Sequence, residues 1–288
     1  MNKKIILSIS LLFTLTLSFA NCNQSPQSKE TEETSDINET IAEESPIEVP
    51  QLPAYPLGVV ALMESYPDFI KGYENDSIIF SDGSRMIYDD GVERSFNDML
   101  DNSSLKDMFY SVYVGTDSVP GYLMDAGRSR NEALFKRMYG SSASEVQKNM
   151  EKVNWFGQSM QFTSRNGAAA QLRKVAEELA EHPELKKYLK SAGTFYWRPV
   201  RGANRLSAHS YGIAIDIGTE YSDYWLWRNP GAKETSKIKH SNRMPKEVVE
   251  IFEKHGFIWG GGWYHFDTMH FEYRPEILRY KELVASGS

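Results

Sequence analysis

Two short stretches of the chain hold the residue types that bind a catalytic metal ion. The first contains His209 and Asp216, and the second contains Asp267 and His270. Two imidazoles and two carboxylates are ligand types that suit a catalytic Zn²⁺. Three of these groups can hold the metal while the fourth moves a proton. We therefore expect a metallohydrolase if folding brings the four side chains together.

The local pattern indicates how three ligands could converge. Residues 212–217 alternate so that three isoleucines share one face and Asp216 lies on the other. A carboxylate buried alone is very costly, so Asp216 is expected to be solvated or paired. His209 precedes it across Gly212, where the chain can turn without a β-carbon penalty. His270, on a second predicted strand, would complete a three-ligand set and leave the fourth position for water.

Asp267 comes three residues before His270 and is placed to act on that water as a general base. Zinc lowers the pKa of water from near 16 to roughly 7, so a carboxylate can complete the deprotonation near neutral pH. General-base help is typically worth about 10²–10⁴ in rate. At least one arginine of the preceding segment could face the site and stabilise an oxyanion or hold a substrate carboxylate. These arginines are Arg198, Arg201 and Arg205.

The same stretches resemble a known family of peptidases. Residues 207–216 (Ser-x-His-x-x-Gly-x-Ala-x-Asp) resemble the first zinc signature of the D-alanyl-D-alanine carboxypeptidase and dipeptidase family. This family includes the vancomycin-resistance VanY and VanX type enzymes and the L-alanyl-D-glutamate endopeptidases. Residues 256–263 with 267–272 resemble its second signature, and Trp197-Arg198-Pro199 resembles its arginine segment. The resemblance covers roughly residues 160–280.

The resemblance implies a role for each matching residue. His209, Asp216 and His270 would bind one zinc ion. Asp267 would act as base and then as proton donor, and Arg198 would polarise the scissile carbonyl.

Three further residues have either a supporting role at the site or a packing role. Ser207 is expected to contact substrate or support the metal, Trp263 to line the groove, and Glu272 to orient His270. Three aromatic residues form either a substrate wall or part of the core, and they are Tyr224, Trp225 and Trp227. The other histidines have ordinary structural explanations, and none of them matches a family position: His182, His240, His255 and His265.

The fold class expected is α+β, with a small antiparallel sheet flanked by helices, similar to the Hedgehog and D-Ala-D-Ala peptidase fold. A small mixed N-terminal region (55–155) is expected to precede the catalytic domain (156–288). Periodicity, caps and turn residues predict helices over 57–72 (interrupted at Pro67), 127–140, 142–153, 167–181 and 245–255. Strands are predicted over 77–88 (as a hairpin), 194–198, 212–217 and 269–273.

The N-terminus predicts export. Residues 1–20 combine two lysines with an apolar run, which is typical of a secretory signal peptide. The single cysteine, Cys22, excludes internal disulfides, and it is either a lipid-anchored residue or an unmodified thiol after cleavage behind Ala20. We expect the periplasm or cell envelope, with membrane attachment only through Cys22.

Residues 21–54 predict a disordered acidic linker, because their composition cannot bury enough apolar surface to offset chain entropy. The chain carries a net charge of −7, and the linker contributes −7 while the signal contributes +2. The remainder is therefore nearly neutral, which gives no electrostatic case for binding nucleic acid.

The expected function is hydrolysis of a peptide bond in peptidoglycan stem peptides, with D-alanyl-D-alanine carboxypeptidase activity favoured. Two alternatives are an L-alanyl-D-glutamate type endopeptidase and a non-hydrolytic cell-wall-binding module on the same fold. The second alternative requires a broken set of ligands or base, whereas all four positions are filled here.

Overall fold

The structure is a computed structural model, and it describes residues 55–287. The expected signal peptide (1–20), the expected linker (21–54) and Cys22 lie outside the described residues. Among the described residues, no helix has the length and apolar character needed to cross a membrane.

The described chain is α+β, as the sequence predicts, and its three small sheets are all antiparallel. The helices are α1 (Leu57–Ser65), α2 (Phe96–Asp101), α3 (Glu132–Tyr139), α4 (Ala143–Gln147), α5 (Ala168–Ala180), α6 (Trp225–Arg228), α7 (Lys246–Lys254) and α8 (Pro275–Ser286). The strands are β1 (Ile70–Glu74), β2 (Ser77–Phe80), β3 (Arg85–Ile87), β4 (Met150–Trp155), β5 (Gln158–Thr163), β6 (Ser191–Gly193), β7 (Ala214–Ile217), β8 (Phe257–Trp259) and β9 (His270–Tyr273).

The third sheet, in the order β6-β7-β9-β8, carries the predicted site. Strands β7 and β9 pair so that Asp216 lies directly opposite His270. Directly opposed residues on neighbouring strands have β-carbons about 5 Å apart, so this register by itself brings the two side chains together. On the other face of β7, Ile215 and Ile217 are fully buried in the core. A shift of one residue would exchange the two faces, so core burial fixes the position of the carboxylate.

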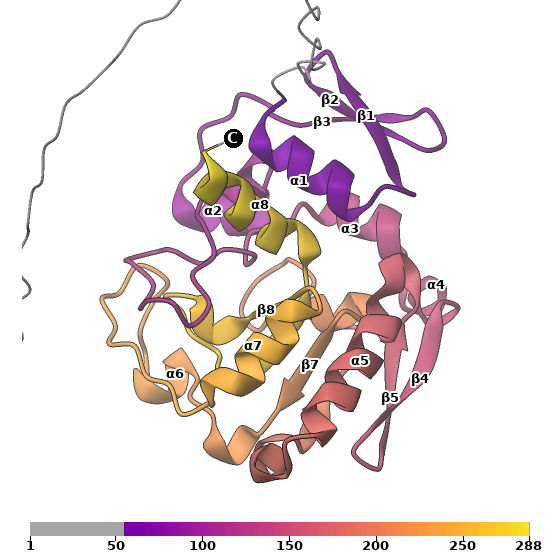
Figure 1. Cartoon of the computed structure of the whole chain (residues 1–288). Helices are drawn as coiled ribbons and strands as arrows, with labels where there is room; N and C mark the ends of the chain where they lie inside the picture. Colours follow the sequence, from indigo (N-terminus) through magenta and orange to yellow (C-terminus); the bar gives the residue numbers. More distant parts are fainter. Residues whose placement is uncertain (1–54, 288) are drawn as a thin grey trace, which may run out of the picture. The chain divides into compact units, whose positions relative to one another are not determined.

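The N-terminal region packs directly on this sheet and its helices. Helix α8 lies beside α1, as Figure 1 shows. The Tyr113 hydroxyl donates to Glu253 on α7 (2.7 Å) and accepts from the backbone N–H of Trp259 on β8 (2.9 Å). The region before residue 155 therefore supports the sheet, and its separation as a domain of its own stays a prediction.

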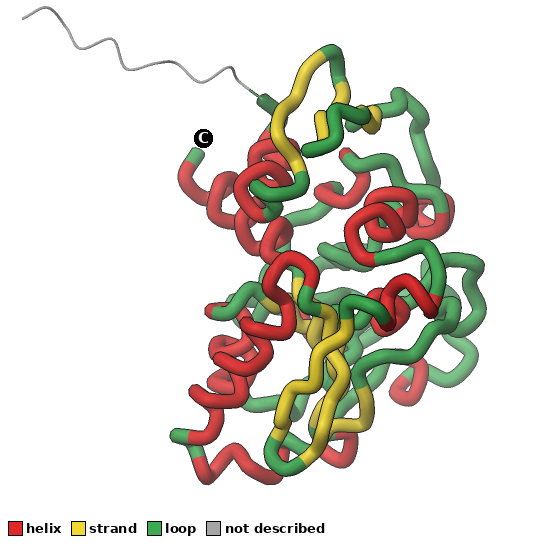
Figure 2. The backbone as a smooth tube through the Cα atoms, turned by 90° about the vertical axis from the view of Figure 1, so that its right-hand side faces the viewer, coloured by secondary structure: helices red, strands yellow, loops and turns green. Residues whose placement is uncertain are grey.

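The hairpin β4–β5 packs against α5, and Figure 2 shows it facing the viewer. The prediction of a helix over 142–153 is right at its start and wrong at its end. Ser142 caps α4 by accepting a hydrogen bond from the Glu145 N–H, but the helix ends at Gln147. From Met150 onward the chain is a strand, because Val153 and Trp155 alternate into the core and six residues pair with β5.

Two other predicted elements differ from the structure. The strand predicted at 194–198 is wrong, since β6 ends at Gly193 and the following residues form no strand. The helix predicted over 57–72 ends at Ser65, and β1 follows from Ile70. The hairpin at 77–88, the helices in 127–140, 167–181 and 245–255, and the strands in 212–217 and 269–273 are confirmed.

Candidate active site

His209, Asp216 and His270 converge, and their potential ligand atoms all lie within 4.8 Å of one another. The Nε2 of His209 lies 3.3 Å from Asp216 Oδ2, and the Nδ1 of His270 lies 2.9 Å from Asp216 Oδ1. His209 lies in a short 3₁₀ turn that Gly212 ends with φ +66°, a conformation that favours glycine. The turn therefore sets His209 over the end of β7.

The outer partners of both rings leave one nitrogen of each free for a metal. The Nδ1 of His209 contacts the backbone carbonyl of Thr194, which can only accept, so this nitrogen carries the proton. The Nε2 of His270 lies 3.0 Å from Glu272 Oε1 and donates to it in the same way. The remaining nitrogens, Nε2 of His209 and Nδ1 of His270, both face Asp216. Such outer hydrogen bonds are what metal-ligating histidines normally make, so the residues present fit a divalent cation.

The electrostatics of this cluster agree with a cation site. Burial alone would raise the pKa of Asp216, but His209 and His270 hold it below its usual range. Burial alone would lower the pKa of His270, but Asp216 and Glu272 raise it to about 10. Burial also acts to raise the pKa of Glu272, yet Arg130 and His270 lower it to about 2. The metal-free cluster therefore holds a proton that a metal ion would displace.

Asp267 lies beside the three potential ligands without joining them. Its backbone N–H donates to the Gly260 carbonyl (3.0 Å), and its Oδ1 is buried with no hydrogen-bond partner in the described part of the chain. Burial and the negative charge of Asp216 raise the pKa of Asp267 to about 7. A buried polar atom without a partner is rare, and it is expected where a reacting group belongs. A carboxylate of this kind can accept and return a proton near neutral pH.

These residues line one cavity of about 300 Å³. Arg198, Ser207, Trp263 and Glu272 also line it, so all eight site residues named from the sequence meet there. The Trp263 Nε1 donates to the Ala126 carbonyl (2.7 Å), which holds its ring 5.6 Å from the His270 ring. Within the described range 55–287, the Arg198 guanidinium donates only to the neighbouring carbonyl of Pro199.

The three aromatic residues after β7 all line the cavity, and two of them, Trp225 and Trp227, take the two different predicted roles. Trp225 is buried, and its ring centroid lies 4.7 Å from that of His265, which makes it a core residue. Trp227 is 56% exposed and therefore stands at the rim.

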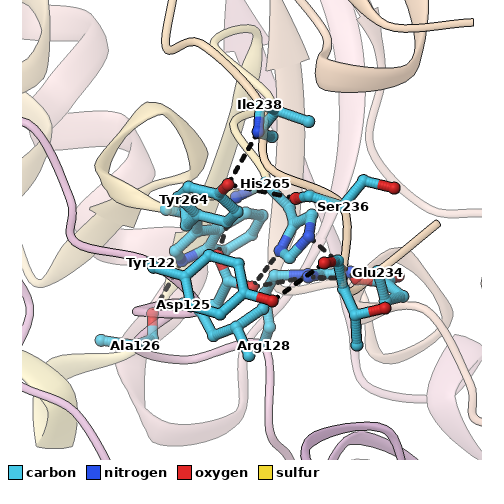
Figure 3. Close-up of polar contacts among 12 residues, drawn as sticks. Tyr122, Asp125, Ala126, Arg128, Glu234, Ser236, Ile238, Tyr264 and His265 are labelled. Carbon is cyan, nitrogen blue, oxygen red and sulfur yellow. Dashed lines mark hydrogen bonds and ion pairs between the residues drawn. The ribbon is translucent and has the colours of Figure 1, made fainter. Parts of the chain in front are cut away.

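A second cluster beside the cavity escaped the sequence analysis (Figure 3). Asp125 accepts from both the backbone N–H (2.9 Å) and the ring Nδ1 (2.5 Å) of His265. Arg128 donates to Asp125 (2.7 Å) and to both carboxylate oxygens of Glu234 (3.0 and 2.9 Å). Asp125, Glu234 and His265 are close enough to share an ion. The Arg128 guanidinium, however, already bridges the two carboxylates, so the cluster is a buried ion-pair network.

This network joins three separate parts of the chain. Tyr264 donates its hydroxyl to the Ser236 carbonyl (3.1 Å) and accepts from the Ile238 N–H (2.7 Å). Tyr122 donates to the carbonyl of Thr235 (2.8 Å). The segment around 234–238 is thereby fixed between the N-terminal region and the loop that leads to Asp267 (Figure 3).

The only local signal for this cluster is the charged run around Gly127, with Asp125, Arg128 and Arg130. Its partners lie more than a hundred residues away, so no local pattern could pair them. Two of the other histidines pair with carboxylates outside the cavity, since His182 contacts Glu184 and His255 contacts Glu178.

Comparison with known proteins supports the resemblance seen in the sequence. Residues 201–273 match the family model described as D-alanyl-D-alanine carboxypeptidase. The match includes His209, Asp216, Asp267 and His270 and excludes the N-terminal region. No curated protein and no solved structure gave a match. The paired histidines and carboxylates lie within this matched segment, which is similar to the D-alanyl-D-alanine carboxypeptidase family of peptidases.

Proposed function

We propose that this protein is a zinc peptidase that removes the terminal D-alanine from peptidoglycan stem peptides. The observation that carries the proposal is the convergence of His209, Asp216 and His270 within 4.8 Å, beside Asp267, whose Oδ1 has no hydrogen-bond partner among the described residues. Two imidazole nitrogens and one carboxylate form the kind of open three-ligand set that catalytic zinc uses. The leader-like N-terminus of the sequence supports a place of action in the cell envelope.

Zinc, when bound, supplies a Lewis acid for the scissile carbonyl and makes water more acidic. Asp267 takes the proton from the attacking water at its Oδ1 and then delivers it to the amine that leaves. Because Oδ1 has no competing partner among residues 55–287, it is free for this exchange. The Arg198 guanidinium has no acidic partner among those residues, and it stabilises negative charge as it develops on the carbonyl oxygen.

Three residues maintain this arrangement. Glu272 holds the Nε2 proton of His270 and keeps the ring in place, while Arg130 (3.0 Å) neutralises the carboxylate from behind. The indole of Trp263 packs beside the His270 ring, with the ring centroids 5.6 Å apart. Ser207 is buried at the cavity wall, where it contacts the substrate or shapes the metal site.

The test combines metal analysis with product masses. Purified protein is incubated with muropeptides that end in D-alanyl-D-alanine, before and after chelation, and again after zinc is restored. The expected result is one bound zinc per chain and loss of one alanine mass, abolished by the chelator and recovered with zinc. Cleavage between the first two stem residues would instead identify an endopeptidase. No mass change with zinc-loaded protein would reject hydrolysis of these substrates.

A His255→Ala variant is the matched control, because His255 pairs with Glu178 away from the cavity. It is expected to retain zinc and activity.

A further inference from the structure

The wall of the catalytic cavity is rich in guanidinium groups. The arginines that line it are Arg128, Arg130, Arg198, Arg201 and Arg205. Two of these have several acceptors, since Arg128 bridges Asp125 and Glu234 while Arg130 pairs with Glu272 and also donates to the Gly127 carbonyl. The other three come from the single segment 198–205 and have far fewer partners.

Arg205 stands out among these because it is buried. Only 8% of its surface is exposed, and the one hydrogen bond that its side chain makes among the described residues goes to Asp101 at the end of α2. Its Nε is buried and has no hydrogen-bond partner in the part of the chain that the structure describes. An arginine has five N–H donors in a planar fork, and the Nε donor of this fork is left unused among the described residues. A buried donor left unpaired costs free energy, typically about 1–3 kcal/mol.

The charges around Arg205 add to the cost of this unpaired donor. Burial and the nearby positive charge of Arg128 lower the pKa of Arg205, while Asp101 and Glu234 act in the opposite direction. Asp101 itself is more than a third exposed and does not line the cavity. Its negative charge therefore stabilises the Arg205 guanidinium from the side away from the cavity. Among residues 55–287, no carboxylate other than that of Asp101 lies within ion-pair distance of Arg205.

We propose that Arg205 binds a carboxylate of the substrate peptide and is a specificity-determining residue of the proposed peptidase. A carboxylate presents two oxygens to the guanidinium fork and accepts two parallel charge-assisted hydrogen bonds. It would satisfy the buried Nε and relieve the repulsion between Arg205 and Arg128. The subsite rests on the proposed function for its substrate, but its own physical basis is the unpartnered guanidinium.

The proposal gives the N-terminal region a part in recognition. Asp101 orients Arg205 from α2, and Arg128 raises the local positive potential from the loop before α3. Both residues lie outside the segment that matches the peptidase family. A site that binds a carboxylate favours substrates that carry one close to the scissile bond. It discriminates against the same peptide after that carboxylate is amidated.

Two carboxylates of a stem peptide share this chemistry, and the test separates them. One is the free carboxyl terminus, and the other is the acidic side group within the stem. Three synthetic peptides are compared: the acid form, the form with a C-terminal amide, and the form with an amidated acidic side group. Each is measured for kcat/KM with zinc-loaded protein and for binding to metal-free protein by titration calorimetry.

The unaltered protein is expected to prefer the acid form over one of the two amides by about 10- to 100-fold, in both kcat/KM and binding. The amide that fails identifies the carboxylate that Arg205 holds. Equal kcat/KM values and equal affinities for all three peptides would overturn the proposal. If no peptide is cleaved at all, the proposed activity fails, while the calorimetric comparison still decides on the subsite.

Arg205→Gln is expected to lose this discrimination, with a raised KM for the acid form and little change for the poor amide. Arg205→Lys is expected to recover only part of it, since a lysine supplies charge without the fork. Arg243→Gln is the matched control, because Arg243 pairs with Asp223 outside the cavity lining. Equal losses on acid and amide in both Arg205 variants would show a structural role and contradict the proposal.

Discussion

Asp125 holds His265 by both its backbone N–H and its ring, at 2.9 and 2.5 Å. The two residues are 140 positions apart, and His265 stands only two residues before Asp267. Since the backbone of His265 is fixed as well as its side chain, Asp125 determines the path of the loop that carries the proposed base. The N-terminal region thereby positions a residue of the catalytic segment.

Replacing Asp125 with alanine is expected to lower both stability and turnover. The substitution removes one of the two carboxylates of Arg128 and leaves the His265 N–H without an acceptor. Breaking a buried pair in this way typically costs about 3–5 kcal/mol of unfolding free energy. Urea unfolding and kcat on the same muropeptide measure the two effects. Glu178→Ala, which breaks partly exposed pairs with Lys254 and His255, should cost under about 1 kcal/mol.

His209→Ala is expected to lose the metal. It removes one of three ligand groups while its neighbours keep their contacts, so zinc should no longer co-purify and activity should fall to background. Metal content by mass spectrometry measures the effect, and His182→Ala, whose partner is Glu184 at the surface, is the control. A variant that still bound one zinc with unchanged affinity would remove His209 from the ligand set.

Asp267→Asn is expected to separate metal binding from catalysis. The amide has nearly the same shape but cannot accept a proton, so kcat should fall about 10²- to 10⁴-fold. Zinc content should stay the same, because the three ligand groups are unaltered. Activity within a factor of about three of the unaltered protein would exclude Asp267 as the base.

Metal affinity is expected to rise with pH. In the metal-free protein Asp216 and Glu272 raise the pKa of His270 to about 10 despite its burial, so the ring carries an extra proton at neutral pH. A ligating imidazole must lose that proton, and apparent affinity should increase about tenfold per pH unit until about pH 10. Competition with a chelator between about pH 6 and 9 measures the slope. In Glu272→Gln the pKa of His270 drops, and the rise should level off at a lower pH.

The separate segment 156–288 is expected not to fold on its own. Its boundary would cut between β4 and β5, which pair over six residues. It would also remove Tyr113, whose hydroxyl joins α7 to β8, and the Ala126 carbonyl that holds Trp263. Circular dichroism of this segment should show no cooperative melting, whereas residues 55–288 should melt in one step. A folded, zinc-binding fragment would support the division drawn from the sequence.

The sequence predicts the elements with strong local signals and the side chains that they carry. The alternation of Ile213, Ile215 and Ile217 fixes both the strand and the face of Asp216. Likewise His270 and Glu272 share a face of β9 and bond to each other, as period-two spacing predicts. These expectations succeed because burial of one face leaves a single register for each strand.

The rest depends on contacts between distant segments. The stretch after Ser142 begins as a capped helix, and only pairing with β5 turns Met150 and its successors into a strand. In the same way, the role of Asp125 depends on its contact with His265, and the role of Arg205 depends on its contact with Asp101 at the end of α2. A charged residue in a loop gives no local indication of a partner a hundred residues away.

The Oδ1 atom of Asp267, which has no hydrogen-bond partner among the described residues, also has a consequence for the melting temperature. A buried carboxylate with a pKa of about 7, whose Oδ1 lacks a hydrogen-bond partner among residues 55–287, weakens the fold, and natural selection retains such a weakness only where activity needs it. An inert, well-packed residue such as leucine at this position should therefore yield a protein that withstands more heat and hydrolyses nothing. At this position, a gain in thermostability would then be accompanied by a loss of turnover.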